Sequence, residues 1–280
     1  MTTLSNCYAP LPLKLQPNHT NYESKKKEEA SNKLRTLHIA MDILSQSNGS
    51  CLYESGYTKI LVSVHGPRSL SASSSSTNSN LTMTKGSLNC NIKYAPYFGK
   101  HNTINALIQP RSLDWNKSTT SHTTNEEMEL SSRLYDALSS SILFEKFPKC
   151  VVDVNVMILQ SDGSILSSAI VASSLALVDS NLECNDLVCS STVAVLEDEG
   201  NYICIADPNE SQMIQSKGIV TLAMLAHSRE VTYWDVSGRL PASIVDNALD
   251  IAKNGCHTVH RFMKQSLIHT YSNPTDSNSF

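Results

Sequence analysis

Residues 151–180 read VVDVNVMILQSDGSILSSAIVASSLALVDS, and this stretch decides the fold class. From Val152 to Ile158, branched apolar residues occupy every second position, which is typical of a strand with one buried face. The Asp162-Gly163 pair that follows suits a tight reversal. Beyond it the residues are small and apolar, with no charge before Asp179, which predicts a helix buried against a sheet. The stretch therefore predicts a strand, a turn and a buried helix in direct succession.

Further strands and a helix are predicted on the N-terminal side of this unit. The segment GSCLYESGYTKILVSVHGP at 49–67 indicates a hairpin that turns at Glu54-Ser55-Gly56. A low-complexity loop at 69–87 precedes another strand, LNCNIKY. A polar loop at 99–123 then leads to a helix, and Thr124 with Glu127 forms a predicted capping box at its start. An apolar stripe repeats every four residues along this helix: Leu130, Leu134, Leu138 and Ile142.

The C-terminal half predicts a second layer and a long helix. Three strand-like runs, LVCSSTVAVLED, NYICIAD and GIVTLAMLAHSREVTYWDV, indicate an antiparallel sheet. After Pro241, apolar residues recur at intervals of three or four as far as Met263, which predicts a helix that covers a sheet. We predict one α+β domain over 34–268, with flexible polar tails at 1–33 and 269–280.

Composition and charge narrow the functions that this chain can have. Its 280 residues include 22 basic and 26 acidic ones, so no global positive field is available to hold nucleic acid. The eight cysteines are scattered without a C-x-x-C pair, and we expect them to be reduced and mostly buried. His257 and His260 have metal-compatible spacing but no evident third ligand, so we interpret them as surface or packing residues and expect no cofactor.

The sequence also carries a prediction about cellular compartment. Its N-terminus lacks a basic flank followed by a continuous apolar stretch, and no apolar run reaches the length of a membrane span. We therefore expect the protein in the nucleus or the cytosol, without a membrane partner.

The order hairpin, loop, strand, helix, strand, Asp-Gly turn and helix resembles the ribonuclease PH family. The resemblance rests on NGSCLYESGYTKILVSVHGPR, on residues 151–180, and on four separated motifs: ILSQSNGS, LNCNIKYAPYFG, Asp207-Pro208 and GCHTVHRFMKQSLI. It implies the ribonuclease PH fold, an α+β fold related to the second domain of ribosomal protein S-five, with mixed and antiparallel sheets packed with helices. Within the family the details are most similar to a ring subunit of the eukaryotic RNA exosome, of the third mRNA-transport regulator type. The sister ring subunit is the alternative.

The resemblance also implies where an active site would lie. Active members hold phosphate with an arginine and backbone donors in the turn after the central strand, and they use two aspartates six residues apart. Here Ser164 is followed by Ile165 and Leu166 where the active pattern has Gly-Thr-Arg, and aliphatic side chains offer no donor to phosphate. Asp207 matches the first aspartate, but Met213 occupies the second position and can neither transfer a proton nor bind magnesium. We interpret these five residues as a degenerate former active site, with Asp207 a turn residue bonded to nearby backbone.

The predicted function follows from the resemblance and from these losses. We expect a non-catalytic structural subunit of the hexameric exosome ring, which supports 3′–5′ RNA processing, including rRNA processing, and RNA degradation. Its partners would be other ribonuclease PH-like ring subunits, first in a heterodimer and then in the hexamer, with exosome cap proteins and RNA. Nucleus, nucleolus and cytoplasm are the expected locations. Six basic residues are candidates for RNA contact: Arg68, Lys93, Lys100, Arg111, Lys117 and Arg133.

Two functions from other classes compete with this hypothesis. An active phosphate-dependent 3′–5′ exoribonuclease would release nucleoside diphosphates in the presence of phosphate. A stand-alone RNA-binding module would need a basic surface interleaved with aromatic residues, and the net charge of -4 with 6% aromatic residues opposes it.

Overall fold

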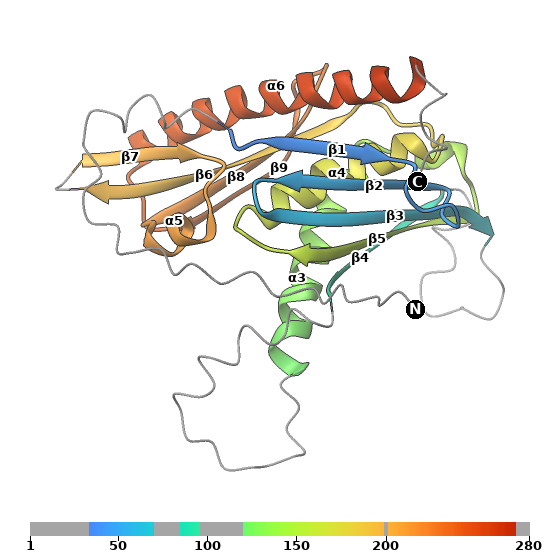
Figure 1. Ribbon diagram of the computed structural model, residues 1–280, viewed down its shortest axis with the longest axis horizontal. Helices are drawn as coiled ribbons and strands as arrows, with labels where there is room; N and C mark the ends of the chain where they lie inside the picture. The colour runs from blue at the N-terminus through green and yellow to red at the C-terminus, as the bar shows by residue number, and fades with distance from the viewer. Residues whose placement is uncertain (1–33, 70–84, 96–119, 199–200, 273–280) are drawn as a thin grey trace, which may run out of the picture.

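The structure is a computed structural model, and it describes residues 34–69, 85–95, 120–198 and 201–272 (Figure 1). The elements in chain order are β1 (Leu37–Met41), β2 (Gly49–Ser55), β3 (Thr58–Ser69), β4 (Ser87–Tyr94), α3 (Thr120–Ser139), a short 3-10 helix (Phe144–Lys146), β5 (Cys150–Gln160), α4 (Ile165–Asp179), β6 (Val188–Asp198), β7 (Asn201–Ala206), α5 (Glu210–Gln215), β8 (Gly218–Leu225), β9 (Val231–Gly238) and α6 (Ala242–Ser272).

The strands form two sheets. The first has five strands in the order β1-β2-β3-β5-β4, in which β4 and β5 are parallel and the other neighbours are antiparallel. The second has four strands in the order β7-β6-β8-β9 and is antiparallel throughout. One mixed and one antiparallel sheet packed with helices confirm the predicted α+β class.

Helix α4 lies in the core and contacts β2 and β3 of the first sheet and β6 of the second. Its residues from Leu166 to Leu177 are all buried, as the uncharged sequence predicted. Small side chains let the two sheets approach it closely, and the Ser174 hydroxyl accepts a hydrogen bond from the Val188 N–H at 3.0 Å. The predicted strand, turn and buried helix are therefore confirmed, and they hold one continuous core together.

Two further helices cover the sheets from outside α4. Helix α6 runs along the second sheet (Figure 1). Four residues of its predicted apolar stripe are buried, namely Ala252, Cys256, Val259 and Met263, whereas Val245 and Leu249 are half-buried. Helix α3 packs along β4 and satisfies two of its backbone donors. The Ile92 N–H donates to the Ser131 hydroxyl at 2.9 Å, and the Tyr94 N–H donates to Glu127 Oε1 at 3.1 Å. These bonds fix the helix that carries one wall of the site described below.

Several predicted boundaries differ from the structure. Helix α3 begins at Thr120, so the predicted capping box at Thr124 is wrong, because the Glu127 carboxylate bonds to β4 instead of to its own helix start. Helix α6 ends at Ser272, beyond the predicted end at Ile268. Ser69 and Ser87, the ends of the predicted low-complexity loop, belong to β3 and β4. Residues 70–84 of that loop, most of the polar loop and the 1–33 tail lie outside the described residues.

Helix α5 was not predicted, although its sequence carries a start signal. The Asn209 side chain accepts from the Gln212 N–H at 2.9 Å, while the Gln212 side chain accepts from the Asn209 N–H at 3.0 Å. This is the capping box that stabilises the first turn of a helix. Its consequence is that Met213, on α5, is held at a fixed place beside the start of α4.

Every cysteine among the described residues is a free thiol. Cys51, Cys189 and Cys256 are fully buried and the other four are half-buried, while Cys7 lies outside the described residues. Burial raises the pKa of the Cys51 and Cys189 thiols to about 12, so they are protonated at neutral pH. No helix in the described part of the chain is both long and apolar enough to cross a membrane.

Candidate functional site

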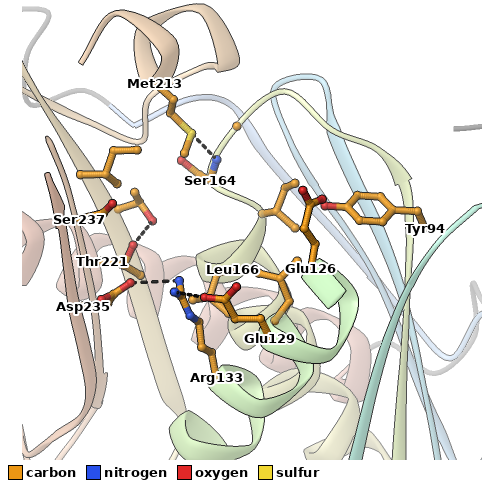
Figure 2. A pocket seen from close by; sticks show the side chains of 15 residues that line it. Tyr94, Glu126, Glu129, Arg133, Ser164, Leu166, Met213, Thr221, Asp235 and Ser237 are labelled. Atoms are coloured by element: carbon orange, nitrogen blue, oxygen red, sulfur yellow. Dashed lines mark hydrogen bonds and ion pairs between the residues drawn. The ribbon is translucent and has the colours of Figure 1, made fainter. Parts of the chain in front are cut away.

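A cavity of about 350 Å³ lies among α3, the start of α4, α5 and strands β8 and β9. Ser164, Ile165, Leu166 and Met213 all line it, so the structure brings four of the five predicted former active-site residues together (Figure 2). The fifth, Asp207, is not among the lining residues. The cavity therefore gathers most of the residues that the resemblance places at an active site.

The turn between β5 and α4 is fixed by contacts with distant parts of the chain. The Thr58 hydroxyl accepts from the Asp162 N–H at 3.0 Å and donates to the Gly163 carbonyl oxygen at 3.0 Å. Gly163 has a φ of 81°, and a Cβ at this position would lie 2.6 Å from the Pro208 carbonyl oxygen. Glycine is therefore required here both by the backbone conformation and by the close approach of a neighbouring segment.

Ser164 has both of its donors occupied within the protein. Its backbone N–H donates to Met213 Sδ at 3.2 Å (Figure 2). Its hydroxyl donates to the Pro208 carbonyl oxygen at 3.1 Å. The sulfur of Met213 thus accepts a hydrogen bond from the turn at which active relatives are expected to bind phosphate. An incoming phosphate would have to displace the thioether to reach this donor.

The charges around the cavity are mostly negative. Glu126 and Glu129 come from α3 and Asp235 from β9, and Arg133 is the only cationic side chain among the described lining residues. Arg133 donates to Glu129 Oε1 and, at 3.0 Å, to Asp235 Oδ2 (Figure 2). Three carboxylates against one guanidinium leave two negative charges unbalanced. Such a cavity repels phosphate.

Tyr94 lines the same cavity, and the pKa of its hydroxyl is affected by nearby carboxylates. Burial raises the pKa of the Tyr94 hydroxyl, and the nearby charges of Glu126 and Glu127 raise it further. A hydroxyl whose pKa is raised stays protonated and does not supply a base at neutral pH.

The Asp207 carboxylate, which follows the second-sheet strand β7, accepts hydrogen bonds from Arg35 and from Ser55 of the first sheet. Arg35 Nε donates to its Oδ2 at 3.0 Å, Arg35 Nη2 to its Oδ1 at 2.6 Å, and the Ser55 hydroxyl to its Oδ2 at 2.8 Å. Arg35 Nη1 also donates to the Asp162 carbonyl oxygen at 2.8 Å. The prediction that Asp207 bonds to nearby backbone is wrong, because both of its oxygens are taken by side chains from the beginning of the domain. A two-point guanidinium–carboxylate pair of this kind has a structural role.

The basic candidates for RNA contact lie in different places. Arg68 and Lys93 are exposed on the outer face of the first sheet, where Arg68 Nε is 2.5 Å from Asp153 Oδ2. Arg133 points into the cavity and is bound to two carboxylates. Lys100, Arg111 and Lys117 lie outside the described residues. Among the described residues, the candidates therefore do not form one continuous basic surface.

The Arg68–Asp153 pair gives a pH dependence that can be measured. Burial alone would raise the pKa of Asp153, but hydrogen bonds from Arg68 and Asn89 outweigh it, so its pKa in the folded protein is lowered. Such a group contributes stability above the pKa of the unfolded chain and loses it as the pH falls through the folded pKa. We expect Asp153→Asn to reduce the fall of the urea midpoint on acidification below about pH 4.

The control for this prediction is Asp250→Asn on α6, whose carboxylate is exposed and bonded to Lys253. This variant is expected to keep the pH dependence of the wild-type chain. If Asp153→Asn and the wild type lose stability in parallel from neutral pH to pH 3, the Asp153 prediction is wrong.

The carboxylates that line the cavity were not predicted from the sequence, although the spacing of those on α3 could have indicated them. Glu126, Glu129 and Arg133 are spaced at three and four residues, which places them on one face of a helix. Asp235 is 102 residues from Arg133 and carries no local signal of this contact. His257 and His260 lie on α6, and the described residues contain no group of three side chains suited to a metal ion.

Similarity to known proteins agrees with this architecture. Residues 33–183 match the model of the 3′ exoribonuclease family, domain 1, and residues 186–255 match domain 2 of the same family. The chain is 28% identical over 224 residues to the Arabidopsis thaliana exosome complex component RRP41-like, covering 80% of this chain and 76% of that protein. It is 24% identical over 234 residues to exosome complex component Rrp41 of Cenarchaeum symbiosum, covering 83% and 86%. The crystal structure of rice Rrp46 superimposes with a TM-score of 0.65 at 21% identity, covering 85% of this chain and 97% of that one, and it shows the fold.

Proposed function

Because the chain belongs to the 3′ exoribonuclease family of ribonuclease PH-like proteins, we propose that it is a non-catalytic subunit of an RNA exosome ring. Membership in the complex is supported by relatives that are themselves named exosome complex components and that match over most of this chain. The proposed role is to complete the ring, to hold cap proteins, and to help pass RNA during 3′–5′ processing, rRNA processing and degradation. The proposed compartments are the nucleus, the nucleolus and the cytoplasm.

One observation carries the proposed loss of catalysis. The Ser164 N–H is bonded to the sulfur of Met213, at the turn where an active relative would offer donors to phosphate. Around this bond the walls are aliphatic and the net charge is negative. Phosphate binding by donors and cations, which phosphorolysis requires, is therefore opposed by both the local hydrogen bonding and the electrostatics.

The ring position is the finer part of the proposal. We infer a subunit of the third mRNA-transport regulator type, with the sister ring subunit as the alternative. The Rrp41-named relatives and the rice Rrp46 neighbour are other members of the same family, and their similarity supports ring membership more strongly than it supports either position.

The test of the proposal is to purify the tagged full chain from its own cells and to identify its stoichiometric partners. Ribonuclease PH-like chains together with cap proteins are expected in equal amounts. Recovery of the chain alone, or as a homo-oligomer, would contradict the ring proposal.

The purified complex also tests the loss of catalysis. Release of nucleoside diphosphates from single-stranded RNA in phosphate is compared between complexes that carry the wild-type chain and Asp207→Asn, with equal assembly checked by gel filtration. Equal rates are expected, because Asp207 is bonded to Arg35 and Ser55 and does not line the cavity. A rate that falls about 100-fold in the variant would instead identify this chain as an active phosphate-dependent exoribonuclease.

A further inference from the structure

The cavity beside α4 has apolar walls that would accept an aliphatic chain. Leu130, Ile165, Leu166 and Ile219 contribute branched side chains from three different elements. In Figure 2 the labelled Leu166 lies next to Glu129 and Arg133, so apolar and charged groups share one space. A ligand that fits must therefore present carbon atoms along its length and a charged group as well.

The charged group must be a cation. Glu126, Glu129 and Asp235 line the cavity, and Arg133 already binds one oxygen of Glu129 and one of Asp235. No ion pair is seen for Glu126 within the described part of the chain. Because two negative charges are left unbalanced, an additional cation would be attracted and an additional anion repelled.

Two buried hydroxyl groups with spare lone pairs also line the cavity. Thr192 is 3% exposed and Thr221 is 8% exposed, and their Oγ1 atoms are 3.3 Å apart. This single bond uses one proton and one lone pair, whereas each hydroxyl oxygen can accept two hydrogen bonds. An ammonium or guanidinium group is a donor without acceptors, so it complements these oxygens as well as the carboxylates.

From these three features we propose that the cavity receives a lysine or arginine side chain from a neighbouring protein chain. The inference rests on the proposed function, because it places the chain in an assembly. Lysine and arginine combine a stem of three or four methylene groups with a terminal cation, which matches a cavity lined by leucine and isoleucine side chains together with carboxylates.

A protein is favoured over a free cation by the surroundings of the cavity. The two elements that carry the carboxylates also expose large apolar side chains: Met128 and Tyr135 on α3, and Val231 and Trp234 on β9. Exposed aromatic and methionine side chains are typical of surfaces that become buried in a protein interface.

The test uses the complex purified through the tagged chain, in which each neighbouring chain is quantified by mass spectrometry at increasing salt. Glu126→Lys replaces an anion of the cavity lining by a cation. It is expected to lower the recovery of one neighbouring chain about tenfold, with Glu126→Gln intermediate, because like charges then face each other. The matched control is Asp136→Lys, which makes the same charge change at an exposed position of α3 that does not line the cavity.

The outcomes separate this inference from the proposed function. Full recovery of all neighbours with Glu126→Lys would overturn the inference and leave ring membership intact, whereas a wild-type chain recovered alone would overturn both. Equal losses in Glu126→Lys and Asp136→Lys would show a general charge effect and would also overturn it.

Two further measurements complete the design. The first is spermidine binding to the isolated chain, measured by calorimetry. If Glu126→Lys abolishes this binding while the recovery of neighbouring chains is unchanged, the cavity binds a free polyamine instead of a protein side chain. Urea midpoints of the isolated variants that match the wild type show that the substitutions act on the contact and not on folding.

Discussion

Replacing Arg35 by alanine is expected to lower the free energy of unfolding by about 3 to 5 kcal/mol. The Arg35 side chain is 16% exposed and that of Asp207 is 12% exposed, so neither charge is compensated by water once its partner is removed. Arg35 also binds the Asp162 carbonyl oxygen, which makes it a link between β7 and the turn before α4. The measurement is urea unfolding followed by circular dichroism.

The control for this prediction lies on the neighbouring hairpin. The Lys59–Glu54 pair has a similar separation of 2.9 Å, but its side chains are 42% and 27% exposed. Lys59→Ala is therefore expected to change stability by less than about 1 kcal/mol. A double-mutant cycle of Arg35→Ala with Asp207→Ala isolates the interaction between the two groups. A loss below about 1 kcal/mol in Arg35→Ala would show that the pair is not a structural link.

Gly163→Ala is expected to destabilise the fold by about 3 kcal/mol or more, through two additive effects. A left-handed backbone conformation disfavours any residue with a Cβ by about 1–2 kcal/mol. The new methyl group would also meet the Pro208 carbonyl oxygen at 2.6 Å, and such overpacking costs a further 1–3 kcal/mol or so. The backbone carbonyl cannot move away easily, because Pro208 precedes the capping residue of α5.

Gly56→Ala separates the two effects. Gly56 has a φ of 58°, but its added Cβ would meet the Arg35 side chain, at 3.0 Å from Cδ, instead of a backbone atom. Because this contact needs a smaller adjustment than the 2.6 Å contact at Gly163, mainly the conformational part of about 1–2 kcal/mol is expected. Equal losses in the two alanine variants would mean that the contact between the turn and Pro208 is not a steric constraint. Urea midpoints measured under one set of conditions decide between the two results.

The fold was predictable because its signals are local. The alternation from Val152 to Ile158 and the uncharged helix after Gly163 lie within one window of sequence, and so does the period of the last helix. Boundaries were less predictable. In the structure α3 begins at Thr120, and the Glu127 carboxylate bonds to strand β4. This long-range bond takes the place of the local capping bond that the Thr124 and Glu127 pattern suggested.

The candidate site was predictable only where the resemblance supplied positions. Ser164, Ile165, Leu166 and Met213 were expected to belong together, and all four line one cavity. The role assigned to Asp207 was wrong, because its partner Arg35 is 172 residues away in the sequence. The acidic lining was not anticipated, although Glu126, Glu129 and Arg133 share one helical face.

The sequence by itself determined the strand, turn and buried helix of the core, because periods of two and 3.6 residues can be read without knowing any long-range contact. The resemblance then supplied the positions at which Ile165, Leu166 and Met213 stand in place of the residue types expected to bind phosphate and metal. Only the tertiary structure decided that Met213 accepts from Ser164, that Arg35 holds Asp207, and that Asp235 meets Arg133. These partners are brought together by two sheets that close around α4, and the relative placement of the sheets depends on packing across the whole core, which no local pattern encodes.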